Sequence, residues 1–192
     1  MFQHRTVVLA FAAATTIGLL PTASGAADQK PVFDLSAPGH REWSFLGKKN
    51  VGFNPTVPGC DGGNLSPALQ WSKAPAATKS FAIVLVDLSG NPPLGFVHWV
   101  AYGIPASKTG LKEGEASKPS SEFTGGKSGI GRDTYFGPCP PAGEKAHPFT
   151  FVLMATDLAP GALGPGLTRD ELATALRGHI VGRTTLVLRY GG

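Results

Sequence analysis

Charged residues are scarce in this sequence, and those present form no cluster. Asp, Glu, Lys and Arg together make up only 16% of the 192 residues, and the formal net charge is +4. Lys48 and Lys49 are the only adjacent basic pair. Proteins that bind nucleic acids concentrate basic side chains on one face or along one helix. The composition therefore predicts no nucleic-acid partner.

Cysteine is nearly absent, with only Cys60 and Cys139 in the whole chain. The two are far apart, and the histidines lack the spacing of zinc ligands, so we expect no redox Cys-x-x-Cys site, no metal and no cofactor. In an oxidising compartment an even pair of cysteines is more often a disulfide than two free thiols. A disulfide closing a loop of about 80 residues would stabilise the fold by about 4 kcal/mol in the chain-entropy model.

Long apolar runs are also missing, apart from residues 7–20. This run is shorter than the roughly 20 residues of a membrane-spanning helix. Arg5 precedes it and small residues follow at positions 23–27, which is the order found in a secretory signal peptide. We predict that residues 1–27 are removed and that 28–192 form one exported domain, periplasmic or secreted. The alternative is an uncleaved N-terminal anchor.

The residues that are abundant indicate a turn-rich, mainly β protein. The chain has 26 Gly and 17 Pro, while its 42% hydrophobic content argues against disorder. Runs of β-branched and aromatic residues predict core strands at 81–87, 96–104, 149–155 and 183–190. The Gly-, Ser- and Lys-rich stretch 105–131 lacks hydrophobic periodicity and predicts a long loop that is mobile or functional.

One helix is clearly indicated near the C-terminus. Thr168 and Glu171 have the spacing of a capping box, and Leu172 and Leu176 fall on one helical face. Gly178 follows as a helix terminator.

Polar residues interrupt or border the predicted strands. Asp87 ends the first strand, His98 lies inside the second and His147 precedes the third, with Asp133 and Tyr135 as weaker candidates. Such groups can ligate a metal, act as acid and base, or donate hydrogen bonds to an anion. The structural alternatives are a satisfied core histidine for His98 and a turn-capping role for Asp87.

Four segments, in order, resemble the signature blocks of the phosphatidylethanolamine-binding protein family. They are NLSPALQWSKAPAATKSFAIVLVD (64–87), GFVHWVAYGIPAS (95–107), YFGPCPPAGEKAHPFTFVLMATD (135–157) and ELATALRGHIVGRTTLVLRY (171–190). The chain resembles the bacterial branch of this family, which is similar to Raf kinase inhibitor proteins. The resemblance implies a β-sandwich of two sheets with a few short peripheral helices.

The resemblance also implies a small anion pocket at one end of the sandwich. The residues that match the family's pocket motifs, or would lie on the same wall, are Asp87, His98, Tyr135, Gly137, Pro140, Pro141 and His147. In this interpretation the imidazoles donate to anion oxygens, Asp87 orients an imidazole or receives a ligand amine, and Gly137 lets backbone amides approach. A Cys60–Cys139 bridge would tie an N-terminal loop to the pocket wall.

The chain departs from the family pattern in two places. The family's DPDAP block is DLSGN here, residues 87–91, so Ser89 replaces the second acid and both prolines are gone. The family's HRY segment is His147, Pro148 and Phe149, which removes a guanidinium and a phenol. The pocket is therefore expected to be less polar than is usual in the family.

Three functions remain open from the sequence. The first is a non-enzymatic exported protein that binds a small anionic or phosphorylated ligand. The second is an inhibitor or interaction protein acting on a secreted or host protein such as a protease or kinase. Contact with a membrane surface stays open as well. The third is an acid–base enzyme using His98 and His147, although no activated-nucleophile motif accompanies them.

Overall fold

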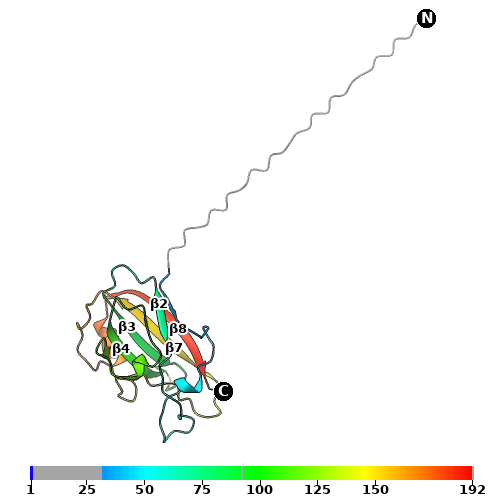
Figure 1. Cartoon of the computed structure of the whole chain (residues 1–192), viewed down its shortest axis with the longest axis vertical. Helices are drawn as coiled ribbons and strands as arrows, with labels where there is room; N and C mark the ends of the chain where they lie inside the picture. Colours follow the sequence, from blue (N-terminus) through cyan, green and yellow to red (C-terminus); the bar gives the residue numbers. More distant parts are fainter. Residues whose placement is uncertain (2–31, 92, 192) are drawn as a thin grey trace. The chain divides into compact units, whose positions relative to one another are not determined.

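The computed structural model describes Met1 and residues 32–91 and 93–191 (Figure 1). Residues 2–27 of the predicted signal peptide lie outside this part of the chain. From residue 32 onward the protein is mainly β, with two antiparallel sheets and three short helices. The predicted two-sheet sandwich with a few short helices is confirmed.

The larger sheet contains all four strands that the sequence predicts. Its order is β6-β4-β3-β7-β8, and Figure 1 shows β4, β3, β7 and β8 side by side. The strand bounds are β3 Ser80–Asp87, β4 Phe96–Pro105, β6 Thr124–Gly125, β7 His147–Thr156 and β8 Ile180–Tyr190. All neighbouring pairs are antiparallel.

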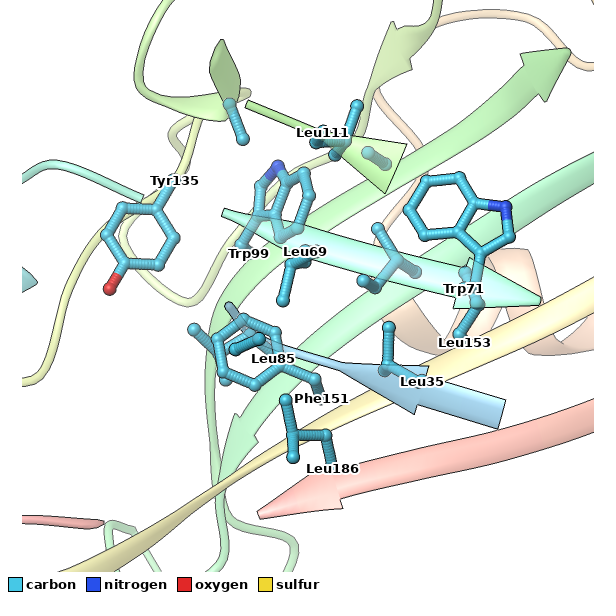
Figure 2. Close-up of a cluster of buried hydrophobic side chains, with 14 of the residues drawn as sticks. Leu35, Leu69, Trp71, Leu85, Trp99, Leu111, Tyr135, Phe151, Leu153 and Leu186 are labelled. Atoms are coloured by element: carbon cyan, nitrogen blue, oxygen red, sulfur yellow. The ribbon is translucent and has the colours of Figure 1, made fainter. Parts of the chain in front are cut away.

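The smaller sheet covers one face of the larger one. It has the order β1-β2-β5, with bounds β1 Asp34–Ser36, β2 Leu69–Ser72 and β5 Gly110–Leu111. Figure 2 shows Leu69 and Trp71 of β2 facing Leu85 and Phe151 of the larger sheet. This layer of apolar side chains is the main core, and its burial is the dominant stabilising term.

The opposite face of the larger sheet is also covered. Leu172 of helix α1 (Arg169–Ala175) and Leu176, which directly follows the helix, belong to one apolar cluster with Val84 and Val100. Every residue of β3 is therefore buried, which explains why its sequence is a continuous apolar run rather than an alternating one. The predicted capping box is confirmed, since the Thr168 side chain accepts from Glu171 N and the Glu171 carboxylate accepts from Thr168 N.

An irregularity in β4 decides where His98 points. Val97 pairs with Val86 and Trp99 pairs with Leu85, so His98 is an extra residue without a partner on β3. Val97 and Trp99 consequently face opposite layers, and the His98 ring lies on the main-core side against Phe149. Such a bulge re-aims a side chain that strict alternation would send to the other face.

The stretch 105–131 is more structured than the sequence predicts. It contributes β5, β6 and the 3-10 helix η2 (Glu115–Ser117), while η1 (Lys48–Asn50) lies earlier in the chain. Hydrogen bonds to the segment around Ser66 anchor it: Ala116 N donates to Ser66 Oγ, and Ser66 N donates to Ser117 Oγ. No helix in the described ranges is long and apolar enough to span a bilayer.

Candidate functional site

A cavity of about 330 Å³ lies where β3 ends, β4 begins and β7 begins. Its wall is mostly apolar, with a few polar groups among aromatic and proline side chains. The lining residues include five of the seven predicted site residues, namely Asp87, His98, Pro140, Pro141 and His147. A mostly apolar hollow with a few convergent polar groups is typical of a small-ligand site.

The strand register brings Asp87 and His147 together. Asp87 pairs with Phe149, two residues along β7 from His147 and hence on the same face as His147. The Asp87 Oδ2 atom lies 2.7 Å from His147 Nδ1, and Asp87 Oδ1 accepts from Ser89 N at 2.9 Å. Both side chains are almost fully buried. The turn-capping role and the site role of Asp87 are therefore compatible.

Glu144 holds the other nitrogen of His147, with Oε2 lying 3.0 Å from Nε2. Burial by itself disfavours the charged imidazole, but hydrogen bonds and attraction from Asp87 and Glu144 outweigh it and raise the pKa of His147. With a carboxyl group beside each nitrogen, both ring nitrogens are placed to donate, which favours the protonated form of His147.

His98 has the opposite character. Its Nδ1 atom lies 3.0 Å from the Phe136 carbonyl oxygen and 3.1 Å from that of Gly137. The ring is surrounded by Phe96, Phe136 and Phe149. This burial lowers the pKa of His98 to about 4, despite hydrogen bonds to the carbonyls and the nearby Asp87. His98 is therefore neutral at pH 7.

The proline-rich wall is anchored covalently and by backbone hydrogen bonds. Cys60 and Cys139 form the predicted disulfide, with Cα atoms 5.2 Å apart, and both cysteines line the cavity. Gly52 N donates to the Pro138 carbonyl oxygen at 2.9 Å. Pro138 and Cys139, which are neighbours in the wall, are thus each joined to the loop formed by residues 51–62.

Tyr135 and Gly137 are not among the cavity-lining residues. Tyr135 is fully buried in the main core, where burial raises its pKa and its hydroxyl donates to the Asn50 carbonyl oxygen at 3.0 Å. Gly137 packs so closely on Asn50 that an added Cβ would lie 2.0 Å from the Asn50 carbonyl oxygen. Gly137 thus makes room for backbone of its own chain and presents its carbonyl to His98. Asp133 is exposed and does not line the cavity.

Several site residues were missed by sequence reasoning. Asn64, which the sequence analysis does not single out, supports the wall: its Nδ2 donates to the Tyr135 carbonyl oxygen at 3.1 Å and its Oδ1 accepts from Gly137 N at 2.9 Å. Glu144 lies three residues before His147, and this spacing is the sequence signal that could have identified it as a partner of that histidine. Asn54 and Asn91 also line the cavity, and no sequence signal distinguishes them from ordinary turn residues.

Comparison with known proteins gives a consistent result. The family model for phosphatidylethanolamine-binding protein matches residues 48–191. A UPF0098 protein of Aquifex aeolicus is 36% identical over 140 residues, covering 71% of this chain and 80% of that protein. The putative lipoprotein LppC of Mycobacterium tuberculosis is 35% identical over 133 residues, covering 69% of this chain and 63% of LppC.

A solved structure agrees with these matches. The crystal structure of Escherichia coli YbcL, described as a new member of the mammalian PEBP family, superimposes with a TM-score of 0.75 at 25% identity. The superposition covers 84% of this chain and 99% of that one.

Proposed function

The chain belongs to the phosphatidylethanolamine-binding protein family, and on this premise we propose that it is an exported, non-enzymatic protein that binds a small phosphate-type group. The observation that carries the proposal is the convergence of Asp87, His98 and His147 on one cavity of about 330 Å³. That volume suits a small ligand or the head of a larger one.

The chemistry of the wall supports binding rather than catalysis. Both nitrogens of His147 are held by carboxylates, so neither is placed to exchange a proton with a ligand. The cysteines at the cavity are joined in a disulfide, which removes their nucleophilic thiols. An acid–base role would also need a group with a pKa near the working pH, and the pKa of His98 is about 4.

Export is supported by the disulfide, because such bonds persist in oxidising compartments. The order of residues in the N-terminal segment supports the same location. The name of one relative, a putative lipoprotein, is consistent with it.

Thermal unfolding with added ligand tests the proposal. Inorganic phosphate and phosphoethanolamine, compared with sodium chloride at matched ionic strength, should raise Tm in a concentration-dependent way that saturates. His98→Ala should remove the shift. His179→Ala is the control, because His179 does not line the cavity and its Nδ1 atom contacts Asp157.

A Tm that responds to none of these anions beyond the chloride control would contradict the proposal. In that case pull-down from the exported fraction, comparing the natural chain with His147→Ala, would test the interaction-protein alternative.

A further inference from the structure

Only one of the two cavity imidazoles can donate a hydrogen bond to an anion. His98 is neutral at pH 7, and its Nδ1 atom lies 3.0 and 3.1 Å from the carbonyl oxygens of Phe136 and Gly137. A carbonyl oxygen only accepts, so the single N–H of this ring is at Nδ1 and Nε2 keeps a lone pair. The protonated form of His147, in contrast, carries a hydrogen on both nitrogens. The donor for an anion is therefore His147.

The two carboxyl groups beside His147 are held to different degrees. The Asp87 side chain is 5% exposed, and it also accepts from Ser89 N at 2.9 Å. The Glu144 side chain is 53% exposed, and within the described ranges its contact with His147 is its only hydrogen bond. An exposed ion pair contributes little to stability, because water screens it. Asp87 is thus a fixed partner of the ring, whereas Glu144 can leave at small cost.

Glu144 reaches the ring from the solvent side of the site. It lies in the loop between the proline wall and β7, and its backbone N–H donates to the carbonyl oxygen of the cavity-lining Pro141 at 3.3 Å. Its Oε2 atom is 3.0 Å from His147 Nε2, while Nδ1 of the same ring faces the buried Asp87. Because a half-exposed side chain reaches Nε2, this nitrogen lies on the more accessible edge of an imidazole that itself lines the cavity.

We propose that the Glu144 carboxylate is a built-in competitor, which takes up the Nε2 donor of His147 in the ligand-free protein and is displaced by a phosphate-type ligand. The proposal rests on the proposed function and adds how the ligand is held. Carboxylates and phosphates both accept charge-assisted hydrogen bonds, so the same N–H suits either group. The exchange leaves no buried charge without a partner, because Asp87 stays on Nδ1 and the Glu144 carboxylate moves into water.

Glu144→Asp tests this role, because the substitution keeps the charge and shortens the side chain by one methylene group. The shorter carboxylate should no longer reach Nε2, so the donor is free for the ligand. Phosphate should then bind about two- to fivefold more tightly, which corresponds to the loss of one exposed ion pair.

Titration calorimetry with inorganic phosphate and with phosphoethanolamine, at pH 6 and constant ionic strength, measures this change. The pKa of His147 is raised above the ordinary 6.5, so the ring is protonated at this pH. Glu42→Asp is the matched control, since Glu42 is exposed and does not line the cavity. This variant should bind both probes as the natural chain does.

Glu144→Gln separates competition from simple repulsion between charges. It keeps the length of the side chain and removes its charge. If Glu144 acted only by repelling anions, Glu144→Gln would bind phosphate more tightly and Glu144→Asp would not, and this result would overturn the proposal.

A crystal structure of the natural chain with inorganic phosphate follows the contact itself. A phosphate oxygen should lie within hydrogen-bond distance of His147 Nε2, and the Glu144 carboxylate should lie outside it.

The outcomes separate the two proposals. Equal phosphate affinity in the natural chain and Glu144→Asp, or a phosphate complex in which Glu144 still contacts Nε2, overturns the competitor role and leaves the proposed function standing. Binding of neither probe by any of these proteins overturns the proposed function, and the competitor role with it.

Discussion

At the scale of single residues, the two cavity histidines have very different surroundings within one site. His147 gains two carboxylate partners, whereas His98 is enclosed by aromatic rings and has only backbone carbonyls at Nδ1. Their pKa values move in opposite directions from the ordinary value of 6.5, upward for His147 and down to about 4 for His98. Environment rather than residue type assigns the charge.

This difference predicts a maximum of stability near pH 6.5. As the pH falls from 6.5 to about 4, the unfolded chain protonates its His98 while the folded chain does not, so stability is lost. The loss reaches about 3 kcal/mol, at about 1.4 kcal/mol per pKa unit. As the pH rises through the raised pKa of His147, the folded chain loses its imidazolium and the stability that it provides.

Urea unfolding between pH 4 and 9 measures both effects. His98→Gln should flatten the acidic side of the profile, and Glu144→Gln should shift the alkaline decline to lower pH. Glu42→Gln, with the same charge change in another segment, should leave the profile unchanged. Identical profiles for all four proteins would refute this account.

At the scale of elements, the two faces of the larger sheet have different surroundings. One face carries the main core and, where β3 ends and β4 begins, the side chains of Asp87 and His98. The other face is covered by Leu172 of α1 and by Leu176. The bulge at His98 is what places the imidazole on the first face.

Loss of the helix cap should therefore destabilise the protein without affecting the cavity. Thr168→Ala removes the capping-box hydroxyl, with an expected cost of about 1 kcal/mol in the free energy of unfolding. Phosphate affinity, measured by calorimetry under conditions where the variant is folded, should match that of the natural chain. A large loss of affinity would show that α1 and the cavity are coupled through the sheet.

At the scale of the whole molecule, the Cys60–Cys139 disulfide joins parts of the chain separated by 79 residues at the rim of the cavity. It constrains the unfolded chain and fixes the wall formed by Pro140 and Pro141. The stability of the fold and the position of the cavity wall are therefore linked through one bond.

Replacing both cysteines, Cys60→Ser with Cys139→Ser, should lower the free energy of unfolding by about 4 kcal/mol in the chain-entropy model. Phosphate affinity should fall as well, because the wall loses its covalent anchor. Urea unfolding and calorimetry, with and without reductant, measure these effects. Reductant should lower the free energy of unfolding of the natural chain and leave that of the double variant unchanged. Unaltered phosphate affinity in the double variant would mean that hydrogen bonds such as Gly52 N to Pro138 O hold the wall in place without the disulfide.

The sequence alone determined the β class, the four long strands and the capped helix, because each depends on local periodicity and on contacts within a few residues. It also pointed to Asp87, His98 and His147, since polar groups in or next to apolar strands need partners. The pairing of the two cysteines followed from their number and the inferred compartment.

Only the tertiary structure decided what these residues do. The contact of His147 with Asp87, the bulge at His98 and the exclusion of Tyr135 and Gly137 from the cavity wall all depend on strand register and on loops distant in sequence. The same holds for the charge states, because desolvation and neighbouring carboxylates set them after the chain has folded. Residue type identified the site, but long-range packing determined whether each histidine offers a proton or a lone pair.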